Sequence, residues 1–103
     1  FETNLFIPGD KEGMNVELDK AIRLYDFITM GELVAYDALN RNESCGGHFR
    51  EEHQTEEGEA KRDDENFFYV GCWEYQGKDK DPELIKEPLE YEAIKVQTRN
   101  YKN

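Results

Sequence analysis

Apolar residues recur at intervals of three and four along residues 15–42, a stretch that contains no proline and a single glycine. The stripe consists of Val16, Leu18, Ala21, Ile22, Tyr25, Ile28, Leu33, Val34, Ala38 and Leu39. Such spacing places side chains on one face of an α-helix. Asn15 is suited to cap this helix, and Glu17 and Asp19 fall in the first turn, where the helix dipole favours acids. The pattern therefore predicts one long helix over residues 15–42.

The apolar surface of the predicted helix is wider than this stripe. Four further apolar residues lie off it: Leu24, Phe27, Met30 and Ala35. A helix with two apolar faces is typical of a helical bundle, in which neighbours cover both faces. Gly31, in the middle, indicates a close approach by a neighbouring helix rather than a kink. The helix therefore calls for packing partners.

The flanking segments follow other patterns. Residues 1–14 contain an apolar cluster followed by Pro8, Gly9 and Gly13, and this predicts an irregular arm. Residues 43–66 are polar, with Gly46 and Gly47 marking a turn after the helix and eight acidic residues between positions 51 and 66. We expect a motif turn and a long acidic loop there.

Two strand-like runs follow the acidic loop. Residues 67–75 are dense in aromatic residues and apolar on both faces of a pleated strand. Residues 89–97 alternate less regularly, and the change of parity predicts a bulge near Ala93. With the charged segment 76–88 as a connector, the two runs predict an antiparallel hairpin followed by a tail to residue 103. The expected fold class is α+β.

Composition excludes several classes of function. The chain has 103 residues, 24 Asp and Glu against 13 Lys and Arg, and a formal net charge of -11. This length supports a single small domain with a thin core. The negative charge disfavours nucleic acid and anionic lipid as partners, and no apolar stretch is long enough for a membrane span. Because the chain opens at Phe1 rather than Met, we expect a fragment of a larger protein.

Zinc binding is the most specific chemical function that the residue types alone suggest. Cys45, His48, His53 and Cys72 supply two thiols and two imidazoles. No Cys-x-x-Cys pair is present, however, and Cys72 lies inside a predicted strand, so a structural zinc is only an alternative. We expect two free thiols rather than a disulfide, since nothing indicates export. A nucleophilic Cys45 beside His48 is likewise less favoured than packing in a turn.

Acidic pairs in the loop are the remaining candidates for chemistry. They are Glu51 with Glu52, Glu56 with Glu57, and Asp63 with Asp64. Adjacent acids lack the alternating ligand spacing of a calcium loop, and a solvated face is the favoured interpretation. Phosphate-binding glycine motifs are absent from the sequence.

Two motifs resemble the C-terminal helical domain of the succinate dehydrogenase/fumarate reductase flavoprotein subunit. In that family a helix ends in Glu-Ser-Arg-Gly-Ala-His, and an Arg-Asp-Asp-Glu-x-aromatic segment follows an acidic loop. The matching residues are Glu43, Ser44, Gly46, His48, Arg62, Asp63, Asp64 and Glu65. Cys45 replaces the usual Arg and Gly47 the usual Ala, as in a bacterial variant of the family. Residues 89–101 are similar to the family's tail, so the resemblance spans about residues 13–102.

The resemblance implies a role inside a larger enzyme. Family members interconvert succinate and fumarate by hydride exchange with a covalently held FAD, and pass electrons through an iron-sulfur subunit to or from a quinone. Their flavin- and substrate-binding residues lie upstream of this domain. The resemblance therefore assigns no catalytic, cofactor-binding or metal residue to this chain and gives the eight motif residues a structural or docking role.

Expectations about partners also follow from the resemblance. It places the turn from Glu43 to Arg50 against the FAD-binding domain of the same subunit, and the strand pair and acidic loop on the side where the iron-sulfur subunit can be contacted. The parent complex would be cytoplasmic and peripheral on the inner face of the cell membrane. The isolated chain is expected to self-associate through its helix. The alternatives are a free-standing acidic protein-interaction module and a small zinc-stabilised domain.

Overall fold

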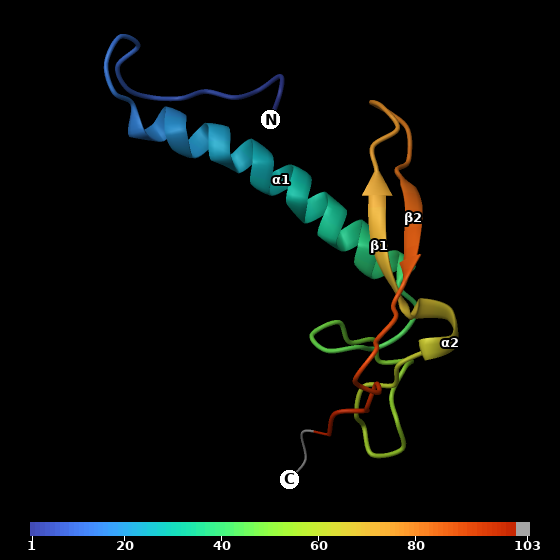
Figure 1. Cartoon of the computed structure of the whole chain (residues 1–103). Helices are drawn as coiled ribbons and strands as arrows, with labels where there is room; N and C mark the ends of the chain where they lie inside the picture. Colours follow the sequence, from blue (N-terminus) through green and yellow to red (C-terminus); the bar gives the residue numbers. More distant parts are fainter. Residues whose placement is uncertain (101–103) are drawn as a thin grey trace. The chain divides into compact units, whose positions relative to one another are not determined.

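A computed structural model describes residues 1–100 of the chain (Figure 1). The last part of the predicted tail, residues 101–103, lies outside the described residues. The chain divides into two compact units, Phe1–Asn40 and the part that begins at Arg41. Their elements are a long helix α1 (Val16–Asn40), a short helix α2 (Asp64–Phe67) and two strands, β1 (Tyr69–Glu74) and β2 (Glu83–Pro88). The predicted α+β class is confirmed.

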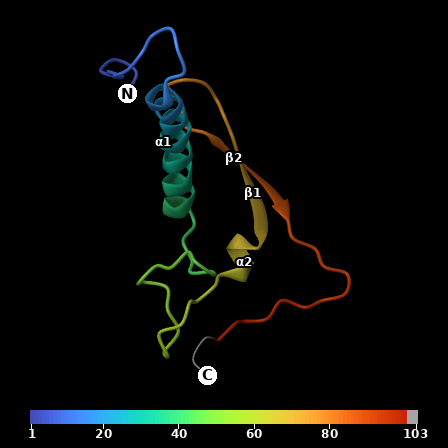
Figure 2. The ribbon, with the colours of Figure 1, turned by 90° about the vertical axis from the view of Figure 1, so that its left-hand side faces the viewer.

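Helix α1 forms where the periodicity predicts it and runs without interruption past Gly31 (Figure 2). Its cap is also the predicted one, because Asn15 Oδ1 accepts a hydrogen bond from the Leu18 amide at 3.2 Å. The Asn15 side-chain amide donates in turn to the Pro8 carbonyl at 3.2 Å. Gly9 permits this approach, since a Cβ there would stand 2.8 Å from Asn15 Nδ2. At the other end, Asn40 Nδ2 donates to the Tyr36 carbonyl at 2.7 Å.

The N-terminal unit has little apolar packing of its own. Phe1 stacks on Tyr25 with ring centroids 5.3 Å apart, and the Tyr25 hydroxyl donates to Glu2 at 3.2 Å. No residue of α1 is buried. Around Gly31, within the described chain, nothing lies within 4 Å of where a Cβ would stand. No side chain of the N-terminal unit therefore approaches Gly31 closely.

The hairpin is antiparallel as predicted, but the position predicted for its second strand is wrong. β2 spans Glu83–Pro88 rather than 89–97, with Tyr69 opposite Pro88 and Glu74 opposite Glu83. Residues 89–97 form no strand, so the bulge expected near Ala93 does not exist. Positive φ angles at Gly77 and Asp79 reverse the chain early in the connector. Pro88 is tolerated because it ends the strand, where its missing N–H breaks little of the ladder.

Two further local elements interrupt the predicted acidic loop. Residues 64–67, at its end, form α2, so the first strand begins at Tyr69 instead of residue 67. Inside the loop, antiparallel bridges join Cys45 to His48 and Gln54 to Ala60. The second bridge closes a small hairpin in which the Thr55 amide donates to the Glu59 carbonyl at 2.8 Å. The acidic segment thus satisfies much of its own backbone.

The most enclosed part of the second unit, which begins at Arg41, is identified by the burial of its residues. Among residues 1–100 no hydrophobic side chain is buried, and the two buried residues are Glu43 and Ser44. Phe67, Phe68 and Tyr69 are only half-buried, with Phe67 packed on Tyr69, and Phe68 lies edge-on to the exposed Tyr91. A thin core is what a chain of this size predicts. The enclosed centre of the second unit is therefore polar.

Candidate functional site: a buried polar cluster at the family motif

Glu43 is the centre of this cluster, and its carboxylate joins two segments of the chain. Oε1 accepts a hydrogen bond from Arg41 Nη1 at 2.7 Å, and Oε2 accepts one from the Asp63 amide at 2.8 Å. Its side chain is 4% exposed, against 23% for Arg41. A carboxylate at this depth requires such partners, because burying an unpaired charge is strongly unfavourable. Glu43, the first residue of the first motif, therefore fixes that motif against the start of the Arg62–Glu65 motif.

Ser44 makes a second connection directly beside it. Its hydroxyl accepts from the Arg50 amide at 2.8 Å and donates to the Arg50 carbonyl at 3.1 Å. Its own amide donates to the Lys61 carbonyl at 3.0 Å. Ser44 is fully buried, and buried polar groups require hydrogen-bond partners, so removing the hydroxyl is unfavourable. The hydroxyl is thus fully engaged in holding the loop closed.

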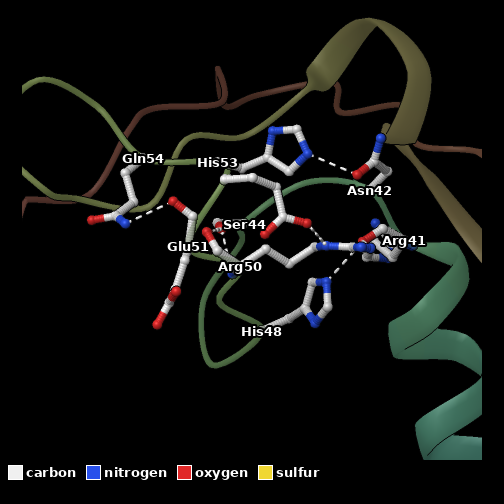
Figure 3. A network of polar contacts seen from close by, with 9 residues as sticks. Arg41, Asn42, Ser44, His48, Arg50, Glu51, His53 and Gln54 are labelled. Atoms are coloured by element: carbon white, nitrogen blue, oxygen red, sulfur yellow. Dashed lines mark hydrogen bonds and ion pairs between the residues drawn. The ribbon is translucent and has the colours of Figure 1, made fainter.

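Gly46 and His48 shape the turn that this loop makes. The backbones of Cys45 and His48 exchange two hydrogen bonds, at 2.8 and 3.0 Å. Gly46 has a φ of 58°, a conformation that favours glycine. His48 Nε2 then donates to the Arg41 carbonyl at 2.8 Å, and Arg50 Nη1 donates to the same oxygen at 3.2 Å (Figure 3). The imidazole therefore has a structural partner.

Arg41 and Arg50 belong to the cluster although the sequence reasoning did not single them out. The Arg41 guanidinium lies 5.2 Å from the Tyr69 ring centroid and 5.7 Å from that of Phe67, and donates to the Phe67 carbonyl at 3.2 Å. Arg50 Nε forms an ion pair with Glu52 at 2.7 Å. The sequence does distinguish these two residues, because they are the only Lys or Arg residues between positions 24 and 60.

The second motif organises the segment around α2. Asp63 caps this helix by accepting from the Asn66 amide at 3.2 Å and from its side chain at 2.9 Å. The hydrogen bond from the Asn66 side chain is the main cause that lowers the pKa of Asp63 below its ordinary value. Arg62 pairs with Asp64 at 2.8 Å and donates to the Gln97 carbonyl at 3.0 Å. Glu65 lies exposed in the first turn of α2.

The four candidate zinc ligands do not come together. His48 Nε2 is engaged by the Arg41 carbonyl, and His53 Nε2 lies 2.7 Å from Asn42 Oδ1. Cys72 lies in β1, and both cysteines are free and exposed. No group of three or more His, Cys, Asp or Glu side chains is arranged to hold a metal ion in the described part of the chain. Within the cluster, the hydrogen bonds of Glu43 and Ser44 join the first motif to residues 61–63.

A comparison with protein families identifies the family of this α+β domain. Residues 2–101 match the family described as "Fumarate reductase flavoprotein C-term". The chain therefore belongs to the C-terminal domain family of succinate dehydrogenase/fumarate reductase flavoproteins, and the resemblance seen in its motifs is confirmed. No curated protein and no solved structure matches the chain. Among residues 1–100, no helix is long and apolar enough to cross a membrane.

FAD is the cofactor that membership of a flavoprotein family implies, and the described residues do not fit it. A dinucleotide needs free backbone N–H donors for its pyrophosphate, typically at a helix N-terminus. At the start of α1 the side chain of Asn15 already occupies the Leu18 amide. A hollow of about 370 Å³ beside the acidic loop is lined by three carboxylates, those of Glu56, Glu57 and Glu59, against one cation, Arg99, and this excess of negative charge disfavours phosphate.

Proposed function

We propose that this chain is the docking and shaping domain of a flavoprotein subunit, and that the parent interconverts succinate and fumarate by hydride exchange with FAD. The parent would exchange electrons with an iron-sulfur subunit, and through it with a quinone. The domain itself would carry out no turnover. In this proposal the partners are the FAD-binding domain and the iron-sulfur subunit, and the complex is cytoplasmic and peripheral on the membrane.

The observation that carries the proposal is the uncovered apolar surface of α1. Across its 25 residues none is buried. The large apolar side chains that it exposes are Val16, Leu18, Ile22, Leu24, Tyr25, Phe27, Ile28, Met30, Leu33, Val34 and Leu39. A helix with this much exposed apolar surface gains stability when another element covers it. A neighbouring domain of the same subunit is the partner that family membership suggests.

The cluster supports the same role from the other unit. Its most reactive groups, the Glu43 carboxylate, the Ser44 hydroxyl and His48 Nε2, are all engaged by neighbouring groups of the chain. Groups held in this way shape a surface rather than transfer protons to a substrate. We therefore assign the eight motif residues to the shape of the docking surface.

Flavin binding and turnover by the isolated chain test the proposal. We expect the purified chain, incubated with FAD and then desalted, to show no flavin absorbance band. We also expect no fumarate-dependent oxidation of reduced methyl viologen above the protein-free rate. The full-length parent subunit serves as the positive control in both assays. Flavin retained at one equivalent per chain, or turnover by the chain alone, would contradict the non-catalytic role.

Self-association of the isolated chain is a second expected result. With its partners absent, the apolar surface of α1 is expected to pair with another copy, and sedimentation velocity should show a mass that rises with concentration. Replacing Phe27 and Val34 together by lysine should return the chain to a monomer, since both are about two-thirds exposed on α1. In the control variant, lysine replaces Asp26 and Glu32 instead, and Phe27 and Val34 are unchanged. A clean monomer at high concentration of the unaltered chain would contradict this expectation.

A further inference from the structure

The β1–β2 hairpin has two unlike faces, which follow from its register. On one face lie Tyr69, Gly71, Trp73, Leu84, Lys86 and Pro88, here named the covered face. Its members pack on one another, because a Cβ at Gly71 would stand 3.1 Å from Leu84 Cδ1 and 3.4 Å from Tyr69 Cε2. Lys86 Nζ lies 4.8 Å from the Tyr69 ring centroid. This face is therefore partly covered by its own side chains, with Tyr69, Trp73 and Leu84 half-buried.

The opposite face, here named the open face, is apolar along its middle and acidic at its ends. It consists of Val70, Cys72, Glu74, Glu83, Ile85 and Glu87, all of them exposed. Val70 is 53% exposed and Ile85 47%. The six residues include three carboxylates and no cation. Glu74 lies directly opposite Glu83, and a pair of like charges in this position destabilises a hairpin. An added cation at this end would relieve the repulsion.

A hollow continues the open face at its other end. Its volume is about 450 Å³, and it is lined by Val70, Glu87, Pro88, Leu89 and Glu90. Apolar walls beside two carboxylates suit a long basic side chain, whose methylene stem lies along the apolar surface while its charged head reaches the carboxylates. The two acidic ends are separated by the length of β1 from Val70 to Glu74, or about 13 Å at the rise of a strand.

We propose that the open face binds an extended segment of a partner protein that carries two arginine or lysine residues about four positions apart, with an apolar residue midway between them. One basic side chain enters the hollow beside Glu87 and Glu90. The apolar side chain covers Val70 and Ile85, and the second basic side chain lies between Glu74 and Glu83. The inference rests on the hairpin alone and does not depend on the proposed role in a flavoprotein.

The test titrates the full chain with a synthetic peptide containing Arg-Thr-Val-Thr-Arg and follows backbone amide shifts by NMR. We expect shifts at Val70, Cys72 and Ile85 and an affinity that falls with added salt. The variant Glu87→Lys should bind about fivefold more weakly. The variant Glu83→Lys should bind more weakly while raising the melting temperature, because it pairs with Glu74 inside the hairpin. Its gain in stability shows that the loss of binding is not caused by unfolding.

Matched controls separate this site from general charge attraction. Glu56→Lys makes the same change of charge in the acidic loop and should leave the affinity unchanged. Peptides with Glu in place of Arg, or with Ser in place of Val, should bind less well. Equal binding of the acidic peptide, an equal loss in Glu56→Lys, or shifts confined to other parts of the chain would overturn the proposal. So would peptide-free dimerisation through the open face, which would make a second copy the occupant.

Discussion

Replacing Glu43 by alanine is expected to lower the free energy of unfolding of the unit that begins at Arg41 by about 3 kcal/mol. The carboxylate is almost fully buried and holds both the Arg41 guanidinium and the Asp63 amide. Its loss leaves a largely buried cation without its carboxylate partner and an amide without an acceptor, and both are unfavourable. Urea unfolding followed by Trp73, the only tryptophan, measures the change within the right unit.

The matched control for this variant is Glu52→Ala. Glu52 also forms an ion pair with an arginine at 2.7 Å, but its side chain is 56% exposed. Water can replace Arg50 there, so a loss below about 1 kcal/mol is expected. Hydrogen exchange adds a local measurement, because the Asp63 amide should exchange faster in Glu43→Ala and remain protected in Glu52→Ala. Equal losses in the two variants would show that burial of the Glu43 carboxylate contributes nothing.

Replacing Ser44 by alanine is expected to lower the free energy of unfolding by about 2 kcal/mol. The change removes a single oxygen atom from a fully buried side chain and leaves the Arg50 amide without its acceptor, while the Arg50 carbonyl keeps the hydrogen bond from the His53 amide. The loss should again be visible in urea unfolding monitored at Trp73. It should also speed exchange of the Arg50 amide.

Thr55→Val is the corresponding change at an exposed hydroxyl. Thr55 Oγ1 accepts from the Glu59 amide at 3.1 Å, where solvent can take its place. We expect a change of about 0.5 kcal/mol, within the range of surface substitutions. If Ser44→Ala were as mild as Thr55→Val, the closure of the motif loop would have to depend on other contacts.

Helix α1 was predictable because local and periodic signals agree. The repeat of apolar residues spans the whole element, and Asn15 caps it through its own side chain. That part of the apolar surface of α1 would stay exposed was predictable, since a short chain cannot cover both apolar faces of a long helix. Only the structure shows that no residue of α1 is buried.

The second strand was not predictable in the same way. Alternation at Leu89 and Tyr91 suggested a strand, whereas Pro82 and Pro88 made the preceding segment look like a connector. The register is set by the turn, where Gly77 and Asp79 adopt positive φ angles. A small difference in where a chain reverses moves the whole partner strand, and propensity alone does not determine the point of reversal.

The candidate site shows a similar division. The motif residues could be named from the sequence. The hydrogen bond between the Glu43 carboxylate and the Asp63 amide, 20 positions away, could not be predicted from it. Contacts to backbone groups leave no trace in side-chain patterns. The contacts of Arg41 and Arg50 were not predictable, because a single cation among many acids resembles a solvated surface residue. In the structure Arg50 donates to the Arg41 carbonyl, and the Arg41 guanidinium lies over the Tyr69 ring.

The small hairpin between Gln54 and Ala60 bears on the order in which this unit folds. Glu43 and Asp63 are 20 positions apart and can meet only after the chain between them has closed into a loop, and the entropy lost in closure grows with loop length. The Thr55–Glu59 turn forms from neighbouring residues and therefore does not need that long closure. Once formed, it shortens the flexible chain that remains. The small hairpin thus lowers the entropy that is lost when Glu43 and Asp63 are brought together.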